Sequence, residues 1–353
     1  MRYIALDPGF GGFKAAEVKP DGTFAEAAIP SVIGVGTTDL GLLDVGLSRR
    51  SRRNKPVTIR FDGSEYLVGQ HVSDYARPVE RLDFNRLADT PELRALAYAT
   101  LYQIVDGGET EISLVVGMPV EVLQSANARD IVKTLSSWLV GGHAFSVDGH
   151  AASLTVMAIR VRAQPLGAFF AWGLDSRGEW MRSSTDWKKS IAILDLGFNT
   201  LDLFTVRSGE ILNRYTAGDT VGMRRAATAL SDHIRRATGR NLSLQETDAV
   251  LREHLEGRKP VMTIGDQEVV LSLMARQALN VAAGEVTSFV TRQWGNGRNF
   301  DQVLLTGGGA LALRRELIRA LPDAILLDNP VTANARGLAQ YACRADVWAK
   351  KAV

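Results

Sequence analysis

The sequence predicts an α/β protein in which one structural plan is used twice. Strand-like apolar runs alternate with helical patterns, and the segment at residues 2–29 recurs at residues 190–216. In the first copy, "RYIALD", "FKAAEV" and "TFAEAAIP" are separated by "PGFGG" and "KPDG". In the second copy, "SIAILD", "TLDLFTV" and "ILNRYT" are separated by "LGFN" and "RSGE". Each copy therefore predicts a three-stranded antiparallel meander whose first bend needs glycine.

The two meanders align residue by residue at a constant offset of 188. The matched pairs are Asp7 with Asp195, Gly9 with Gly197, Phe10 with Phe198, and Val18 with Val206. A repeat at this spacing predicts two halves built alike. We expect a first domain over residues 1–165 and a second over 166–330, with a helix in 331–353 packing back on the first.

The segments between and after the meanders supply the rest of an α/β architecture. Residues 111–123 predict a buried strand ending in a Gly-Met-Pro turn, and residues 125–139 a helix. The segment "AASLTVMAIRVRAQPLGAFFAWGL" begins as a strand and becomes helical at Pro165, because proline suits a first helical turn. Further patterns predict helices at 220–238, 245–255 and 272–293, a strand and helix around "LLTGGGALAL", and a final strand "AILLD" and helix "TANARGLAQYACRA".

Composition narrows the class of protein. The chain has 353 residues, 46% hydrophobic and 23% charged, with a net charge of +2, so we expect no dominant electrostatic partner and no direct sequence-specific binding of nucleic acid. The basic run at 49–55 predicts a solvated loop. A single cysteine, Cys343, excludes an internal disulfide and indicates a reducing cytoplasm. No apolar run is long enough to span a membrane, and His143 and His150 lack partners at zinc-ligand spacing.

Three glycine-rich elements together indicate a phosphate site. Glycine bends let backbone amides approach phosphate oxygens, and an Asp at the end of each preceding strand, Asp7 or Asp195, suits a hydrated Mg²⁺. Lys14 brings a positive charge to the first bend. The third element follows a strand and opens a helix, with Gly307, Gly308 and Gly309. Each element alone is more often a simple turn, but their joint occurrence in this order favours a nucleotide site.

These residues resemble the actin-like ATPases. "LDPGFGGFK" and "LDLGFNTLD" are similar to the two phosphate motifs of that superfamily, and "VLLTGGGALAL" is similar to its adenosine motif. "LVVGMPVEV" and "NPVTANARGLAQYA" resemble segments of the ParM/StbA-like plasmid-segregation proteins. The resemblance spans nearly the whole chain. It implies a duplicated two-domain fold of the actin-like, ribonuclease H-like type, with a central cleft that binds ATP or ADP and Mg²⁺.

The resemblance also implies roles for single residues. Asp7 and Asp195 would position Mg²⁺ through water, and Gln164 would orient the attacking water. Segregation proteins often carry Glu at that place, whereas Gln matches actin. Gln164 has a second interpretation, as an amide that caps the following helix. The nucleotide contacts implied are Gly9, Phe10, Gly11, Gly12, Lys14, Gly197, Phe198, Asn199, Thr200, Asp202, Gly218, Asp219, Gly222, Arg225, Gly307, Gly308, Gly309, Ala310 and Asn334. For Asp219, a helix N-cap is an equal alternative.

A filament-forming ATPase is the function that these features favour. Head-to-tail contacts that do not close produce open polymers, and such a polymer would move plasmid DNA through a separate DNA-binding adaptor. The alternative is a monomeric kinase of the same superfold acting on a sugar or acid, although no Asp base for a substrate hydroxyl is evident. A chaperone-type ATPase is disfavoured because the chain ends at Val353 without a peptide-binding domain. A shape-determining or magnetosome filament would differ only in its cargo.

Overall fold

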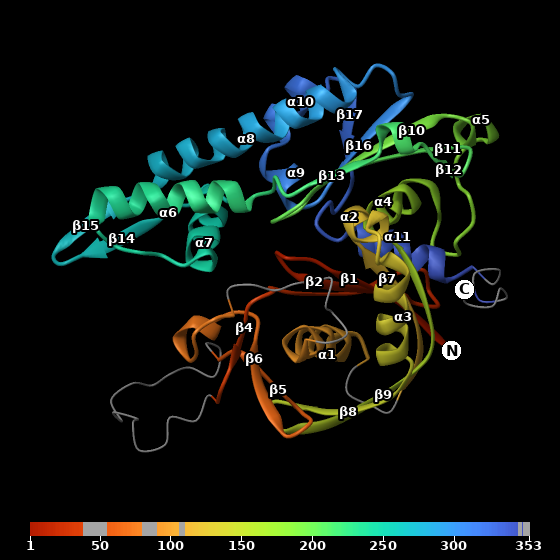
Figure 1. Ribbon diagram of the computed structural model, residues 1–353, viewed down its shortest axis with the longest axis horizontal. Coiled ribbons are helices and arrows are strands. Elements are labelled where there is room, and N and C mark those ends of the chain that lie inside the picture. The colour runs from red at the N-terminus through yellow and green to blue at the C-terminus, as the bar shows by residue number, and fades with distance from the viewer. Residues whose placement is uncertain (38–54, 80–89, 106–109, 345–347, 349–353) are drawn as a thin grey trace. The chain divides into compact units, whose positions relative to one another are not determined.

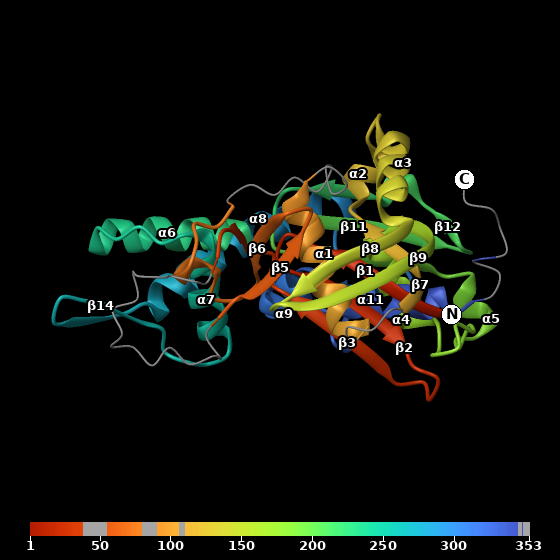
Figure 2. The ribbon, with the colours of Figure 1, turned by 90° about the horizontal axis from the view of Figure 1, so that it is seen from below.

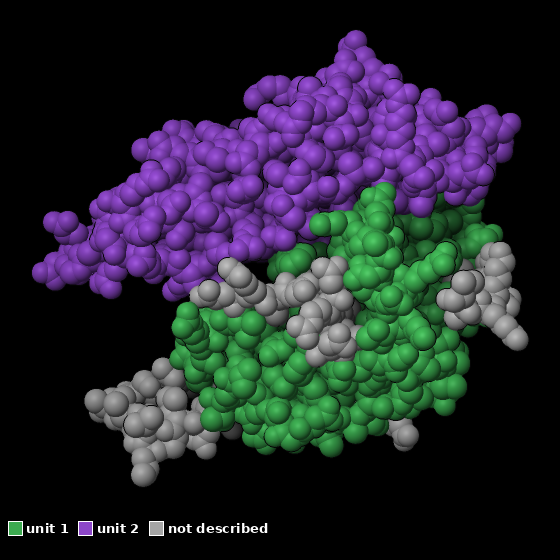
Figure 3. Space-filling model, in the orientation of Figure 1, with its two compact units in different colours: residues 1–182, 332–353 green, residues 183–331 purple. Residues whose placement is uncertain are grey.

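The computed structural model describes residues 1–37, 55–79, 90–105, 110–344 and 348. The chain divides into two compact units, Met1–Arg182 with Thr332–Val353, and Ser183–Val331 (Figure 3). Residues 166–182, which we assigned to the second domain from sequence, therefore lie in unit 1. The basic run predicted as a solvated loop lies outside the described residues except for Lys55.

Unit 1 is built on a nine-stranded mixed sheet in the order β3-β2-β1-β7-β9-β8-β5-β6-β4. At its centre, β1 pairs antiparallel with β2 and parallel with β7, which pairs parallel with β9. The strands are β1 (Arg2–Pro8), β2 (Phe13–Val18), β3 (Phe24–Ile29), β4 (Ile33–Val35), β5 (Val57–Phe61), β6 (Ser64–Val68), β7 (Thr110–Met118), β8 (Gly141–Val147) and β9 (His150–Ala163).

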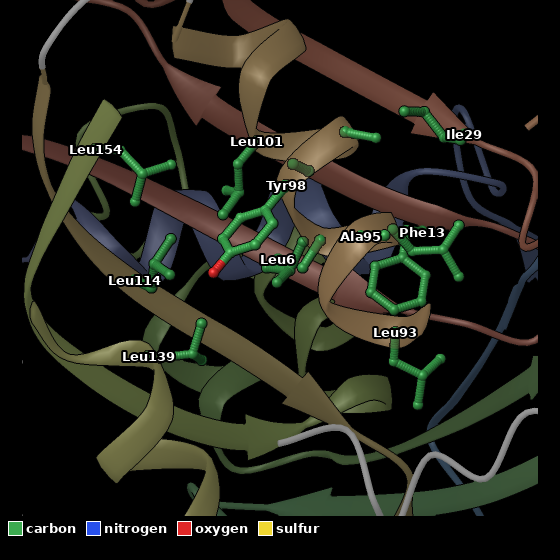
Figure 4. Packing of buried hydrophobic residues seen from close by; sticks show 14 of the residues in the cluster. Leu6, Phe13, Ile29, Leu93, Ala95, Tyr98, Leu101, Leu114, Leu139 and Leu154 are labelled. Carbon is green, nitrogen blue, oxygen red and sulfur yellow. The ribbon is translucent and has the colours of Figure 1, made fainter. Parts of the chain in front are cut away.

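The two faces of this sheet are covered by different helices. One face packs on α1 (Pro91–Val105), whose Tyr98 and Leu101 meet Leu6 and Leu114 of the central strands (Figure 4). The opposite face, which carries Ala5, packs on α11 (Ala333–Ala342). Alternation along β1 thus places Leu6 and Ala5 in two separate cores. The other helices of unit 1 are α2 (Val120–Gln124), α3 (Ala128–Leu139) and α4 (Gln164–Gly173).

Helices α4 and α11 meet at two glycines, and this contact keeps α4 in unit 1. A Cβ atom on Gly337 would lie 2.5 Å from the amide nitrogen of Ala171, and one on Gly167 would lie 2.7 Å from Cα of Asn334. The two backbones can approach this closely only because neither glycine has a side chain. Figure 1 shows α4 and α11 adjacent, with α1 beneath the central strands.

Unit 2 has a smaller sheet in the order β12-β11-β10-β16-β17, with β13 also paired to β11. Its main helices, α6 and α8, pack against each other, and the β14–β15 hairpin projects beyond α6 (Figures 1 and 2). The elements are α5 (Ser184–Trp187), β10 (Ser190–Leu196), β11 (Leu201–Arg207), β12 (Glu210–Ile211), β13 (Ala217–Asp219), α6 (Arg224–Thr238), α7 (Leu244–Leu255), β14 (Val261–Ile264), β15 (Gln267–Val270), α8 (Ser272–Trp294), β16 (Gln302–Thr306), α9 (Gly308–Ala312), α10 (Arg314–Ala320) and β17 (Ala324–Leu326).

The predicted duplication and the α/β fold class are confirmed. Five strands of unit 1, β3-β2-β1-β7-β9, have the same order and relative directions as β12-β11-β10-β16-β17 of unit 2. The hairpin register is also the same: Asp7 lies opposite Lys14, and Asp195 lies opposite Asp202, each 188 residues further on. The third strand of the second meander is shorter than predicted. β12 ends at Ile211, and Asn213–Tyr215 form a 3-10 turn instead.

Candidate functional site

Asp7 lies at the end of β1 on the face covered by α11, because it shares that face with Ala5. The carboxylate is buried, its Oδ2 is 3.6 Å from Nζ of Lys14, and its Oδ1 has no hydrogen-bond partner within the described residues. Burial raises the pKa of Asp7, and the Lys14 ammonium and Gln164 amide oppose that rise. A buried carboxylate oxygen without a donor suits a bound cation or a water held by one.

Gln164 is the first residue of α4, and its side chain turns back toward the first bend. The Nε2 group donates a hydrogen bond of 2.7 Å to the carbonyl oxygen of Pro8. The α4 N-cap is Ala163, with no side-chain cap, so the helix-capping interpretation of Gln164 is wrong. Because Pro8 directly follows Asp7, this hydrogen bond places the Gln164 side chain beside Asp7, as expected if the two residues belong to one site.

Gly117 belongs to this cluster, although the sequence analysis gave it no role in the site. A Cβ atom there would lie 3.0 Å from Cγ of Gln164, 3.2 Å from Cδ1 of Leu338 and 3.3 Å from Oδ1 of Asp7. The absence of a side chain at the end of β7 thus lets the amide, the carboxylate and α11 converge. The Gly-Met-Pro turn was the signal that could have identified it.

The second bend, residues 197–200, is held from one side by the start of α6. The carbonyl oxygens of Gly197 and Phe198 accept hydrogen bonds from the amides of Met223 and Arg224, at 3.2 and 2.6 Å. In a trans peptide the next residue's N–H points away from the carbonyl, so the amides of Phe198 and Asn199 face away from α6. Neither amide has an intramolecular acceptor in the described part of the chain. Two successive N–H groups that point the same way and lack an acceptor are suited to bind an anion.

Other predicted residues of the two bends form hydrogen bonds within the turns. The amide of Gly12 donates to the carbonyl of Gly9 at 3.2 Å, and that of Gly197 donates to the carbonyl of Thr200 at 2.9 Å. These two amides are therefore engaged in the structure. Gly222 packs directly under the second bend, where a Cβ atom would lie 2.5 Å from the carbonyl oxygen of Phe198.

Two acidic residues face each other across the hairpin of unit 2. Asp195 and Asp202 are paired directly in the β10–β11 ladder, and both are buried. In unit 1 the equivalent pair is Asp7 with Lys14, which have opposite charges. Like charges directly opposite on one sheet face repel, so the pair in unit 2 favours a cation or donors nearby.

The Thr-Gly-Gly-Gly element packs against Asp195. A Cβ atom on Gly307, whose φ is 91°, would lie 2.7 Å from Oδ1 of Asp195. The amide of Gly307 and the hydroxyl of Thr306 both donate to the carbonyl of Pro330, at 2.8 and 3.1 Å. Gly308 has open space around it, whereas Gly309 and Ala310 are buried in the core of unit 2. Of these residues, Gly308 is the one the structure leaves open to a ligand.

The remaining predicted residues lie in varied settings. Gly218 and Asp219 form β13, and α6 has Met223 as its N-cap, so the helix-cap alternative for Asp219 is wrong. Arg225 forms an ion pair with Glu285 on α8, at 3.2 Å. Asn334 is buried in α11, in unit 1. Among the described residues, no group of three His, Cys, Asp or Glu side chains is arranged to hold a metal ion.

Two protein families match this chain. "Actin like proteins N terminal domain" matches residues 5–167, and "Archaeal actin homologue MreB-like, C-terminal" matches residues 193–319. The chain belongs to the actin-like superfamily. The resemblance inferred from the three glycine motifs is confirmed, since both families lie within it. A search of curated proteins returned no match.

Solved structures of actin-like proteins share this fold along nearly the whole chain. The archaeal actin homologue Ta0583 is 17% identical with a TM-score of 0.72, and covers 97% of this chain and 99% of its own. A 15-stranded ParM filament from Clostridium botulinum is 21% identical with a TM-score of 0.71, covering 97% and 98%. Bacillus thuringiensis ParM with ATP is 17% identical with a TM-score of 0.65, covering 96% and 97%. At these identities the likeness establishes the actin-like fold.

Proposed function

We propose that this actin-like protein binds Mg-ATP through the bends of both units, hydrolyses it, and polymerises into filaments. The observation that carries the proposal is the second bend, where the amides of Phe198 and Asn199 have no acceptor among the described residues and are aimed away from α6. The first bend repeats the same hairpin register in unit 1. Solved relatives include Ta0583 in complex with ADP and a ParM with ATP, which supports a nucleotide as the anion.

Asp7 and Asp195 are the residues that would hold Mg²⁺, through water. The chemistry fits, because Asp7 is a buried carboxylate with an unpartnered oxygen and Asp195 faces a second buried acid. When bound, Mg²⁺ would neutralise charge on the phosphates during phosphoryl transfer. Lys14 would add a point charge at the β-phosphate. We also assign phosphate contacts to Gly9, Phe10, Gly11 and Gly12 of unit 1 and to Asn199 and Thr200 of unit 2.

Gln164 would orient the attacking water. Its Nε2 group is engaged by the carbonyl of Pro8, so its Oε1 is the atom suited to accept a hydrogen bond from water. A glutamine cannot accept a proton efficiently at neutral pH, which predicts slow hydrolysis governed by positioning.

For Gln164→Ala we expect filaments that form with ATP but persist. The variant lacks the side chain that orients the attacking water, so hydrolysis slows while ATP-dependent assembly is unaffected. Phosphate release and sedimentation, followed together over time, are the measurements. Gln340→Ala is a matched control, since Gln340 donates a buried hydrogen bond to the carbonyl of Leu174, at the opposite end of α4 from Gln164. Filaments of Gln164→Ala that disassemble at the unaltered rate would contradict the assigned role.

Polymerisation is tested by adding ATP and Mg²⁺ to the purified chain. We expect a rise in 90° light scattering and in sedimentable protein, with filaments in negative-stain microscopy. Absence of all three over a wide concentration range would overturn the filament proposal. Stoichiometric phosphorylation of a sugar or acid without scattering would establish the small-molecule kinase instead.

The proposal extends to a cytoplasmic protein that moves plasmid DNA through a DNA-binding adaptor. Its support is the near-neutral net charge of the chain, which indicates no dominant electrostatic attraction to DNA, and the ParM filament among its structural relatives. Within the described residues, no helix is long and apolar enough to cross a bilayer. Co-sedimentation of filaments with the product of a neighbouring gene that binds DNA is the direct test of the adaptor.

A further inference from the structure

The first bend (residues 8–12) and the second bend (residues 197–200) differ in the donor that forms a hydrogen bond to the carbonyl of their first matched glycine, Gly9 or Gly197. In unit 2, the carbonyl of Gly197 is held by the backbone amide of Met223, at the entrance to α6. In unit 1, the equivalent carbonyl of Gly9 accepts a hydrogen bond of 2.5 Å from the hydroxyl of Ser31. Within the described residues, no helix amide donates to the carbonyl of Gly9; the Ser31 hydroxyl donates to it, together with the amide of Gly12 inside the turn at 3.2 Å.

The position of Ser31 is constrained by burial and by hydrogen bonds of the backbone around it. It is buried, and the turn around it is closed by a 2.7 Å hydrogen bond from the amide of Val32 to the carbonyl of Pro30. The amide of Gly69 donates to the carbonyl of Val32 at 2.8 Å. The same segment touches the bend at a second point, since a Cβ atom on Gly12 would lie 3.0 Å from the carbonyl oxygen of Ile29.

We propose that Ser31 is a positioning residue for phosphate binding at the first bend. Its hydroxyl, together with the amide of Gly12, holds the plane of the Gly9–Phe10 peptide and so directs the Phe10 N–H away from Ser31, as the start of α6 directs the Phe198 N–H in unit 2. The ligand class is the β-phosphate of a nucleoside di- or triphosphate. This role rests on the proposed function, because it assigns Ser31 to the same nucleotide.

The test compares Ser31→Ala with the unaltered chain in calorimetric titrations with ATP, ADP and AMP. The net contribution of one hydrogen bond corresponds to roughly a three- to tenfold change in a dissociation constant. We expect the affinities for ATP and ADP to fall by that factor, while that for AMP, which lacks a β-phosphate, stays unchanged. This dependence on the β-phosphate separates positioning from a general loss of structure.

Thr100→Ala is the matched control. Thr100 is a buried residue of α1 whose hydroxyl donates to the carbonyl of Leu96 at 2.7 Å, in the same unit. It should change thermal stability without changing any of the three affinities. Equal affinities in Ser31→Ala and the unaltered chain, or an equal fall for all three nucleotides, would overturn the role of Ser31 alone. Failure of the unaltered chain to bind ATP or ADP would overturn the proposed function and this role together.

Discussion

Asp195→Ala is expected to reduce ATP hydrolysis to background, a loss on the order of 100-fold or more. Asp195 is buried at the end of β10, beside Gly307 and opposite Asp202, where the second bend begins. Without this carboxylate, unit 2 would no longer hold the proposed Mg²⁺ through Asp195. The negative charge on the phosphates in the transition state would then be less well neutralised. Phosphate release at saturating Mg-ATP is the measurement.

Two further variants sharpen this result. Asp195→Asn keeps the shape of the side chain and removes its charge, so it should lose activity to a similar degree with less effect on stability. Asp186→Ala is the control, because Asp186 is a partly exposed acid of unit 2 that belongs to the capping box of the short helix α5 and pairs with Lys189. Turnover that survives in both Asp195 variants would show that the metal assignment is wrong.

Gly337→Ala is expected to destabilise unit 1 strongly. The added methyl group would overlap the backbone carbonyl of Gly167 and lie 2.5 Å from the amide nitrogen of Ala171, and backbone atoms cannot rotate away. Overpacking typically costs about 1–3 kcal/mol, and we expect the upper end here, which lowers the unfolding temperature by roughly 5–10 °C. Thermal unfolding followed by circular dichroism is the measurement.

The same substitution has the opposite expected sign at Gly284. This residue lies within α8 with no atom near its added Cβ, so alanine meets no obstacle. Gly284→Ala should raise stability by about 0.5–1 kcal/mol, because glycine loses more backbone entropy in a helix than alanine does. Equal behaviour of the two variants would contradict a close approach of α4 and α11.

Much of the fold was predictable because local patterns in this chain are strong. The hairpins at β1–β2 and β10–β11 and the helix starting near Pro165 follow from alternation, glycine bends and proline placement. The β14–β15 hairpin was missed, since its four-residue strands carry no clear alternation. The boundary between the units was also misplaced, because the glycine contact that ties α4 to α11 joins residues 170 apart in sequence.

The candidate site also combines features that local sequence patterns predict with contacts that they do not. The duplicated bends, the paired Asp7 and Asp195 and the glycines beside them could be predicted from the sequence, because turn chemistry is local and leaves a pattern that repeats at a constant offset. Which groups contact those bends depends on the tertiary structure. The partners of Gly117, Ser31 and Arg225 lie on other strands, turns and helices, so the residues next to them in sequence do not identify those partners.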